Sequence, residues 1–405
     1  MIELKKYKLG ELGFFFGGVS TIKKEDYGHG TPFLPYKNVY KNSKVDINEL
    51  ELMNVRALDL ERRSGIYGDI FFTASSETPD EVAMSSVLLD EVENLTYNGF
   101  CKRYRLNDFN TLIPEYARYL FRDISFRREV YQMATGDIRF NISQESLANI
   151  EIEIPDVPTQ KQIAQILTSL DDKIEINLEM NQTLEEMAQA IFKEWCCVED
   201  GIVPDGWSIM RLSELANISS SKRIFREEYQ VDGIPFYRGK EITQLSNGQS
   251  ISTELFISNE RYFEIREKFG VPQINDILIT SVGTIGSIWL VDNDLPFYFK
   301  DGNVTWVKEY KTNINGEFIY QWLKTNEAKE QIMSVTIGST QQALTISALR
   351  NLEILIPDSE TVNKICSQLE AINAKRITNT NQLQSLTQTR NTLLPKLMNG
   401  QLEFV

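Results

Sequence analysis

The chain has 405 residues, 42% of them hydrophobic and 24% charged, which is the composition of a globular protein with room for two or three domains. No apolar run approaches the roughly 18 residues that a membrane span needs, and the first residues are too polar for a secretory signal. The four cysteines and one histidine follow no metal-binding pattern, so a reduced, cytoplasmic protein is expected. The net charge of −15 argues against a polyanionic partner, but residues 156–200 alone contribute −7 and leave the flanking regions only mildly acidic.

The chain contains an internal tandem duplication. Leu9–Leu12 matches Leu212–Leu215 at an offset of 203 residues, and Leu147–Pro155 matches Leu349–Pro357 at an offset of 202. Further matches between these points keep nearly the same offset along the whole chain. The sequence therefore predicts two copies of one unit, each made of a domain followed by a helix.

Each copy begins with a stretch that predicts an α+β domain. Short runs rich in Ile, Val, Phe and Tyr, such as 69–73 and 276–280, are typical of strands. Segments with helical periodicity, such as 114–133, lie between them. The two domains are predicted at residues 1–155 and 201–357.

A long helix is predicted after each domain, at residues 156–200 and 358–405. Apolar residues alternate at spacings of four and three in both, which favours a coiled-coil pair over two separate amphipathic helices packed on their own domains. The pair is expected to be antiparallel. Asn177 and Asn379 occupy the same position in the two copies, and a buried asparagine pair fixes register at a cost in stability. A helix of about 40 residues is about 60 Å long, so the pair is expected to hold two pseudo-twofold-related domains apart. The predicted seam residues are Ile163, Leu167, Leu170, Ile174, Asn177, Leu184 and Ile191, with Ile365, Leu369, Ile372, Asn379, Leu383, Leu386 and Leu393.

Catalytic motifs are absent from the sequence. The stretch 233–240 has the wrong spacing for a phosphate loop, and Glu241 stands where such a loop needs Ser or Thr. A single histidine supplies none of the usual acid–base pairs. The triplet Glu327-Ala328-Lys329 is the nearest approach to a nuclease motif, but it lies on a predicted helix. A non-catalytic binding protein without a metal or cofactor of its own is favoured over a nuclease.

Basic residues interleaved with aromatic ones occur in both domains, together with polar loops, and favour nucleic-acid binding. Lys and Arg neutralise phosphates and can also bind the edge of guanine, whereas Asn and Gln can pair with adenine. A single basic pair is more often part of a solvated surface, less so for Lys37 and Lys240, which occupy the same position in the two copies. The net charge leaves a protein-binding scaffold with two adaptor domains as the alternative. The candidate DNA contacts are Lys23, Lys24, Lys37, Arg62, Arg63, Ser75, Ser76, Lys102, Arg103, Arg105, Arg139, Lys222, Arg223, Arg226, Arg238, Lys240, Ser281, Thr284, Ser339, Thr340, Gln341 and Gln342.

Three stretches resemble the DNA-specificity subunits of Type I restriction–modification systems. They are Ile154–Ile174, which contains Ile-Pro-Asp-Val-Pro-x-Gln, then Ile191–Trp207 and Leu393–Leu402. The resemblance covers the whole chain and implies two target-recognition domains, each followed by a spacer helix. It also implies that the chain has no activity alone and reads an asymmetric, bipartite target in double-stranded DNA, with one domain for each segment and the helices as spacer.

The same resemblance implies partner subunits. Two adenine methyltransferase (modification) subunits are expected, and motor and nuclease (restriction) subunits in the full enzyme. S-adenosylmethionine, and ATP with Mg²⁺, are expected on those partners and not on this chain. The glycine-containing turn Ser281–Gly286 fits the family pattern, whereas Thr73–Thr78 does not, which places the first domain in another recognition subtype.

Overall fold

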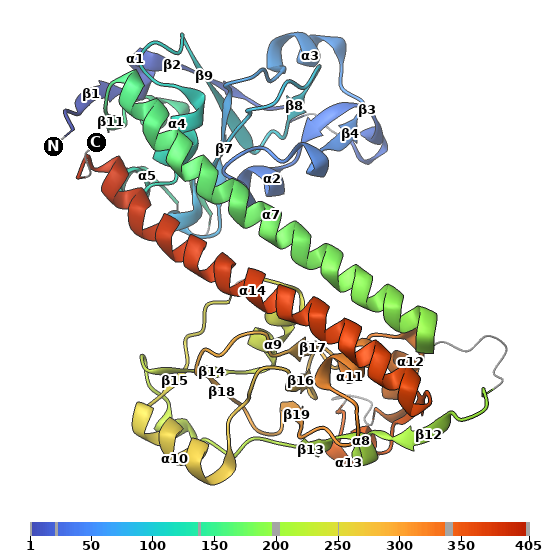
Figure 1. Ribbon diagram of the computed structural model, residues 1–405. Coiled ribbons are helices and arrows are strands. Elements are labelled where there is room, and N and C mark those ends of the chain that lie inside the picture. The colour runs from blue at the N-terminus through green and yellow to red at the C-terminus, as the bar shows by residue number, and fades with distance from the viewer. Residues whose placement is uncertain are drawn as a thin grey trace. The chain divides into compact units, whose positions relative to one another are not determined.

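The computed structural model divides into two compact units (Figure 1), unit 1 with Met1–Ile174 and Leu386–Val405, and unit 2 with Glu175–Ser385. The long helices α7 (Val157–Cys196) and α14 (Ser359–Met398) each contribute one part to both units. The structure describes residues 2–20, 23–136, 139–196, 203–249, 251–336 and 343–401.

Unit 1 is an α+β domain packed on its parts of the two long helices. Its strands are β1 (Lys5–Lys8), β2 (Gly13–Gly17), β3 (Tyr27–Leu34), β4 (Glu51–Met53), β5 (Ile70–Thr73), β6 (Ser75–Ser76), β7 (Ser85–Val87), β8 (Thr96–Tyr97), β9 (Cys101–Leu106), β10 (Phe140–Asn141) and β11 (Glu151–Ile154). Its other helices are α1 (Leu9–Leu12), η1 (Lys24–Asp26), α2 (Tyr36–Lys41), η2 (Ile47–Glu49), α3 (Ala57–Arg63), η3 (Pro79–Glu81), α4 (Pro114–Leu120), α5 (Ile124–Met133) and α6 (Gln144–Ala148).

Unit 2 contains the second α+β domain. Its strands are β12 (Ser208–Arg211), β13 (Asn217–Ser219), β14 (Ile234–Tyr237), β15 (Phe256–Ile257), β16 (Ile277–Thr280), β17 (Ile288–Leu290), β18 (Tyr298–Phe299), β19 (Val304–Lys308) and β20 (Glu353–Ile356). Its other helices are α8 (Leu212–Leu215), η5 (Arg226–Glu228), α9 (Gly239–Ser246), α10 (Asn259–Phe269), α11 (Gly316–Leu323), α12 (Asn326–Val335) and α13 (Ile346–Arg350).

The two domains have the same sheet topology. Unit 1 has a four-stranded antiparallel sheet in the order β2-β9-β5-β7, a three-stranded sheet β4-β3-β8 and the pair β1-β11. Unit 2 has β13-β19-β16-β17, β15-β14-β18 and the pair β12-β20. The pairings of β3 with β8 and of β14 with β18 are both parallel. This correspondence confirms the duplication and the α+β fold class.

The sequence repeat around Leu9 and Leu212 has a local structural cause. In each copy a glutamate three residues after the N-cap accepts a hydrogen bond from the backbone N–H of the N-cap, at 3.0 Å for Glu11 and 2.7 Å for Glu214. The leucine that opens each helix is fully buried in its unit's core. The repeated Leu-x-Glu-Leu therefore starts a helix and anchors it at the same time.

The long helices pair in opposite directions within each unit. In unit 1, Ile163 and Leu167 from the start of α7 belong to the same buried cluster as Leu397 from the end of α14. In unit 2, Phe192 from the end of α7 shares a cluster with Leu369 from the first half of α14. The expected antiparallel pairing of the two helices is confirmed in both units.

Candidate nucleic-acid interface and helix pair

In unit 1, one end of the four-stranded sheet brings together three loops that are distant in sequence. The backbone N–H of Ala74, just after β5, donates to the carbonyl oxygen of Phe100, just before β9, at 2.7 Å. The short strand β6 that follows Ala74 pairs with β10, and the N–H of Ile142 donates to the carbonyl of Ala74 at 3.2 Å. We call the segments 73–76, 98–101 and 139–142 the loop edge of unit 1.

Unit 2 builds the same edge from its own residues. The N–H of Ser281 donates to the carbonyl of Asn303 at 2.7 Å, and the N–H of Leu344 donates to the carbonyl of Ser281 at 2.9 Å. Val282 forms a β-bridge with Ala343, as Ser75 does with Asn141 in unit 1. The loop edge of unit 2 is therefore formed by the segments 280–286, 301–304 and 343–345.

A short helix adds an exposed lysine beside each edge. The Tyr36 hydroxyl, in the first turn of α2, donates to the carbonyl of Ser75 at 2.8 Å. In unit 2 a β-carbon on Gly239, the first residue of α9, would lie 3.8 Å from the carbonyl oxygen of Val282. The next residues, Lys37 and Lys240, are repeat counterparts, and both are exposed.

Two other predicted contacts of unit 1 donate to backbone carbonyls, and four are exposed. Arg63 donates to the carbonyls of Gly17 and Gly18, at the end of β2, and pairs with Asp59 at 3.1 Å. The Lys102 ammonium donates to the carbonyl of Ile142 at 2.7 Å, and burial lowers its pKa. Arg62 and Arg139 are exposed, as are Lys23 and Lys24 in the segment around η1.

Arg103 and Arg105 have structural roles in the interior of unit 1. They lie on the same face of β9, because side chains alternate along a strand. Arg105 binds Asp69 through two hydrogen bonds of 2.7 and 2.6 Å, and this bonding raises the pKa of Arg105. Arg103 is 2% exposed and lies 4.4 Å above the ring of Phe16, and burial lowers its pKa. Sequence reasoning took the run from Lys102 to Arg105 as one basic patch.

Three predicted serines also face inward. The Ser76 hydroxyl donates to the Glu81 carboxylate at 3.0 Å, and Ser75 beside it is buried. The Ser281 hydroxyl is buried and lies 2.7 Å from that of Thr305, whereas Thr284 is exposed. The predicted contacts Ser339, Thr340, Gln341 and Gln342 lie outside the described residues.

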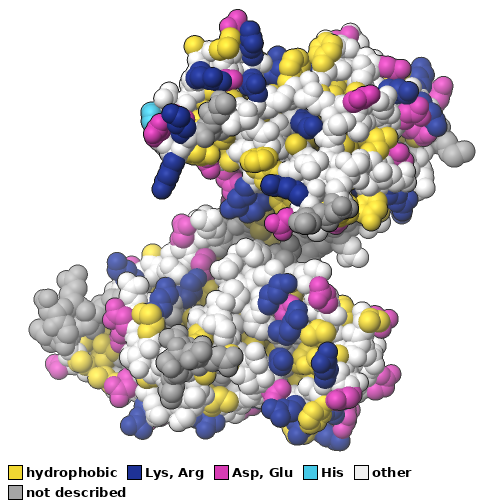
Figure 2. Space-filling view, turned by 180° about the vertical axis from the view of Figure 1, so that it is seen from behind, with side chains coloured by type: hydrophobic (Ala, Val, Ile, Leu, Met, Phe, Trp, Pro, Cys, Tyr) yellow, Lys and Arg dark blue, Asp and Glu magenta, His cyan; other side chains and the backbone are white. Residues whose placement is uncertain are grey.

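The basic candidates of unit 2 gather around its loop edge. Arg223 is exposed and pairs with Asp301 at 2.8 Å, and Lys222 lies 5.1 Å from the ring of Phe269. Arg238 pairs with the fully buried Glu241 at 2.7 Å; the hydrogen bond to that carboxylate raises the pKa of Arg238. Arg226 is exposed on η5. Figure 2 shows Lys and Arg side chains on the visible face of both units, interspersed with Asp and Glu.

Sequence reasoning missed the turn that forms the middle of each loop edge. Asn98-Gly99 occupies this turn before β9, and Asp301-Gly302 occupies it before β19. Asn-Gly and Asp-Gly are dipeptides typical of turns, and they recur at an offset of 203 residues. This recurrence is the sequence signal from which the turn could have been found. The residues that they position, Phe100 and Asn303, belong with the candidate contacts.

Neither a metal site nor a membrane span is found in the described part of the chain. Its His, Cys, Asp and Glu side chains form no group of three suited to a metal ion. Among the described helices, none is both long and apolar enough to cross a membrane.

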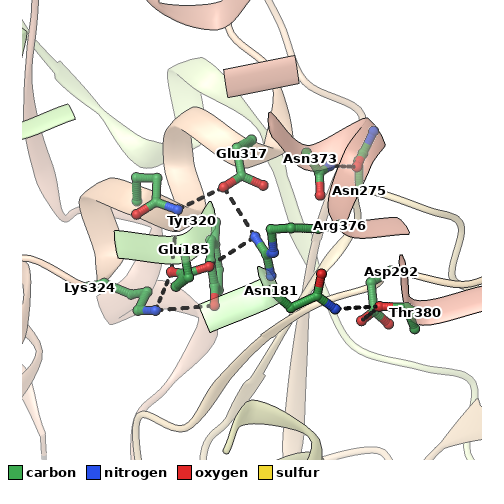
Figure 3. A network of polar contacts seen from close by, with 11 residues as sticks. Asn181, Glu185, Asn275, Asp292, Glu317, Tyr320, Lys324, Asn373, Arg376 and Thr380 are labelled. Carbon is green, nitrogen blue, oxygen red and sulfur yellow. Dashed lines mark hydrogen bonds and ion pairs between the residues drawn. The ribbon is translucent and has the colours of Figure 1, made fainter. Parts of the chain in front are cut away.

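A partly buried ionic network joins α7, α11 and α14 in unit 2 (Figure 3), in which Glu317 is buried and Glu185, Lys324 and Arg376 are half-buried. Arg376 lies 2.9 Å from the Glu185 carboxylate and 3.4 Å from that of Glu317, and Lys324 pairs with Glu185. Burial opposes the charge of Arg376, but these two carboxylates outweigh it and raise its pKa. Burial raises the pKa of Glu317 to about 6, although Arg376 and the Gln321 amide at 2.7 Å favour its charged form.

Unit 1 contains a smaller network at the matching junction. Asp171 of α7 pairs with Arg118 of α4 at 3.0 Å and with Arg390 of α14 at 3.1 Å. It also accepts a hydrogen bond from the Tyr119 hydroxyl at 2.8 Å. In both units, a carboxylate on α7 thus binds a cation on a domain helix and an arginine on α14.

The asparagine bond in the helix pair corrects one expectation from the sequence. Asn379 is fully buried, and its amide nitrogen donates to Asn181 at 2.9 Å, not to its repeat counterpart Asn177. In an antiparallel pair, repeat counterparts lie on opposite sides of the centre of the pair, so each meets a different residue. Of the predicted seam residues, those near the helix starts are buried, whereas Leu170, Ile174, Leu184, Ile191, Leu383, Leu386 and Leu393 are half-buried.

Comparisons with known proteins agree over the whole chain. The family model described as Type I restriction modification DNA specificity domain matches residues 1–186 and 204–388. The MjaIX specificity subunit of a Type I restriction enzyme from Methanocaldococcus jannaschii is 27% identical, covering 99% of this chain and 93% of that protein. The HindI specificity subunit from Haemophilus influenzae is 24% identical, covering 72% and 78%. The crystal structure of a Type I system S subunit from M. genitalium has the same fold, with a TM-score of 0.62, 18% identity and coverage of 98% and 96%.

Proposed function

Because the chain belongs to the family of Type I restriction modification DNA specificity domains, we propose that it selects the DNA target of a Type I restriction–modification enzyme. Each unit reads one segment of a bipartite target, and α7 and α14 serve as the spacer between the recognition domains. The chain contributes recognition, while methylation and cleavage belong to other subunits.

One observation carries this proposal: the same loop edge is built twice, with different side chains. In each unit one inner strand of the sheet, β5 or β16, ends at the loop edge. That edge carries exposed polar or basic groups, with Lys37 and Lys240 at matching positions. Elsewhere on that edge the residues differ, as with Phe100 and Asn303. Two equivalent surfaces with diverged side chains suit a target whose two segments have different sequences.

We propose that the partners are two adenine methyltransferase subunits, joined by motor and nuclease subunits in the restriction complex. S-adenosylmethionine, and ATP with Mg²⁺, then bind to those partners. The family membership and the match to 93% of the MjaIX specificity subunit support this assignment.

Co-expression with a cognate methyltransferase tests the function. The complex should methylate adenine within one asymmetric, split sequence, which sequencing of N6-methyladenine in host DNA identifies. Its affinity for duplexes of that sequence should fall with salt, with a log–log slope near 0.9 for each phosphate neutralised. The double variant Lys37→Ala/Lys240→Ala should weaken binding to every duplex alike and lower the slope by about two. A complex that binds no duplex at low salt would favour the protein scaffold instead.

An insertion tests the spacer role of the helices. Seven residues added to α7 after Ile174, and seven added to α14 after Ser385, preserve the heptad pattern in both helices. Each insertion lengthens a helix by about 10.5 Å, so the gap between the two target segments should grow by about three base pairs. The segments themselves should stay the same in the methylation map. A changed segment with an unchanged gap would contradict the spacer role.

A further inference from the structure

Phe100 is a large apolar side chain held in solvent at the loop edge of unit 1. It is 55% exposed and follows the Asn98-Gly99 turn. Exposed aromatic side chains are normal when they are scattered, but this one lies on the surface that carries Lys37 and Arg139. Its surroundings therefore decide whether it has a role.

The backbone on both sides of this phenylalanine is rigidly held. The N–H of Phe100 donates to the Asn98 side chain at 2.8 Å, and its carbonyl accepts from Ala74 at 2.7 Å. A β-carbon on Gly99 would lie 2.7 Å from the carbonyl oxygen of Val19, so only glycine fits this close approach. The turn thus fixes the backbone from which the ring projects, as an element that contacts a partner requires.

Arg139 reaches the same place from another segment. Thr135 and Asn141 exchange two backbone hydrogen bonds of 2.9 Å, and the Asn141 amide donates to the carbonyl of Arg139 at 3.2 Å. The exposed guanidinium of Arg139 lies 5.4 Å from the centroid of the Phe100 ring. Among the described residues, no carboxylate forms an ion pair with Arg139, in contrast to Arg105 and Arg223. Its donors are therefore available to a ligand.

We propose that Phe100 and Arg139 form the base-reading element of unit 1 in the major groove. The guanidinium donates two hydrogen bonds to O6 and N7 of one guanine, and the ring stacks under it and contacts the methyl group of a neighbouring thymine. Phe100 is then a positioning residue for Arg139 as well as an apolar contact. This inference rests on the proposed function and adds which residues determine one half of the target.

The matching position in unit 2 supports a role in specificity. Asn303 takes the place of Phe100 in unit 2. The carbonyl of each accepts a hydrogen bond from the residue after the neighbouring strand, which is Ala74 after β5 and Ser281 after β16. An asparagine amide pairs with adenine, whereas the arginine–phenylalanine pair suits guanine and thymine. The two units thus differ in chemistry where their backbones agree.

Methylation by the complete complex tests the proposal on duplexes in which each base pair of the target is changed singly. Arg139→Ala should lower the discrimination at one G·C pair of one segment at least tenfold, with the other segment unaffected. Arg139→Lys should lose the same discrimination while the salt slope of binding stays unchanged, because lysine keeps the charge but not the paired donors. Phe100→Ala should weaken discrimination at that pair and at an adjacent T·A pair, and Phe100→Leu at the G·C pair alone.

Lys37→Ala is the matched control, since it is expected to slow methylation of all duplexes equally. Both variant positions are exposed, and thermal unfolding checks that the fold is retained. An equal loss on every duplex for Arg139→Ala would show a phosphate contact and overturn the proposal, as would a target segment without guanine. If the unaltered complex has no defined target at all, the proposed function fails instead.

Discussion

Replacing Arg376 with methionine should lower the free energy of unfolding of unit 2 by about 1–3 kcal/mol at neutral pH. The side chain links α14 to Glu185 of α7 and Glu317 of α11. Together with Lys324, these groups form a partly buried cluster of two anions and two cations. Methionine fills similar space but leaves Glu317 without its cation. This buried carboxyl must then either stay charged where it is poorly solvated or take up a proton, and either outcome destabilises the fold.

Tryptophan fluorescence during urea unfolding measures this effect in unit 2 alone. All five tryptophans of the chain lie between residues 195 and 322, which is within that unit. The double variant Glu317→Gln/Arg376→Met should recover much of the loss, because it removes one anion together with one cation and leaves the Glu185–Lys324 ion pair in place. If Arg376→Met alone unfolds at the same urea concentration as the unaltered chain, the network does not hold the helices.

Arg390→Met in unit 1 is the comparison that isolates the cause. Arg390 also joins α14 to a carboxylate of α7, but Asp171 keeps its ion pair with Arg118 and its hydrogen bond from Tyr119. The carboxylate therefore stays compensated, and the loss should be about 1 kcal/mol or less. Circular dichroism follows this variant, because unit 1 contains no tryptophan.

The stability of unit 2 should fall by roughly 1 kcal/mol as the pH rises from 4.5 to 6, out of about 2 kcal/mol for the complete titration of Glu317. Burial raises the pKa of this carboxyl from 4.5 to about 6 in the folded state. Well below pH 4.5 it is protonated in both the folded and the unfolded chain, and its contribution is fully present. Between the two values the unfolded chain releases the proton first, so folding becomes less favourable until the folded form is also charged.

The difference between the unaltered chain and Glu317→Gln isolates this titration. Glutamine keeps the acceptor for the Gln321 amide at 2.7 Å and does not ionise. The loss of stability between pH 4.5 and 6, followed by tryptophan fluorescence in urea, should therefore be smaller in the variant by the stated amount. Equal pH profiles would show that the carboxyl titrates as it does in water.

The duplication, the α+β class and the paired helices were predictable because their signals are local or periodic. A heptad pattern identifies a helix and its buried face from neighbouring residues. The Leu-x-Glu-Leu repeat marks a helix start in both copies. The family's helical motifs also lie in these segments, so the resemblance could be drawn from sequence.

The candidate contacts depended on pairings between distant residues. The run Lys102-Arg103-Tyr104-Arg105 has the composition of a basic patch. In the structure, however, the Arg105 guanidinium donates two hydrogen bonds to the carboxylate of Asp69, which lies just before the neighbouring strand β5. The bond from Asn379 to Asn181 followed from the antiparallel register, not from the repeat. In both cases the structure differs from the expectation because the residue pairs with one that is distant or differently placed in the sequence, and the local sequence does not identify that residue.

The sequence by itself determined which segments form strands and helices, that the unit occurs twice, and the family to which the chain belongs. Only the tertiary structure decided which charged side chains are available to a ligand. The loop edge of unit 1, for example, joins Ala74, Phe100 and Ile142 through backbone hydrogen bonds. The physical reason is that exposure and pairing depend on strand register and on contacts between residues far apart in the chain, whereas helix and strand formation depends largely on near neighbours.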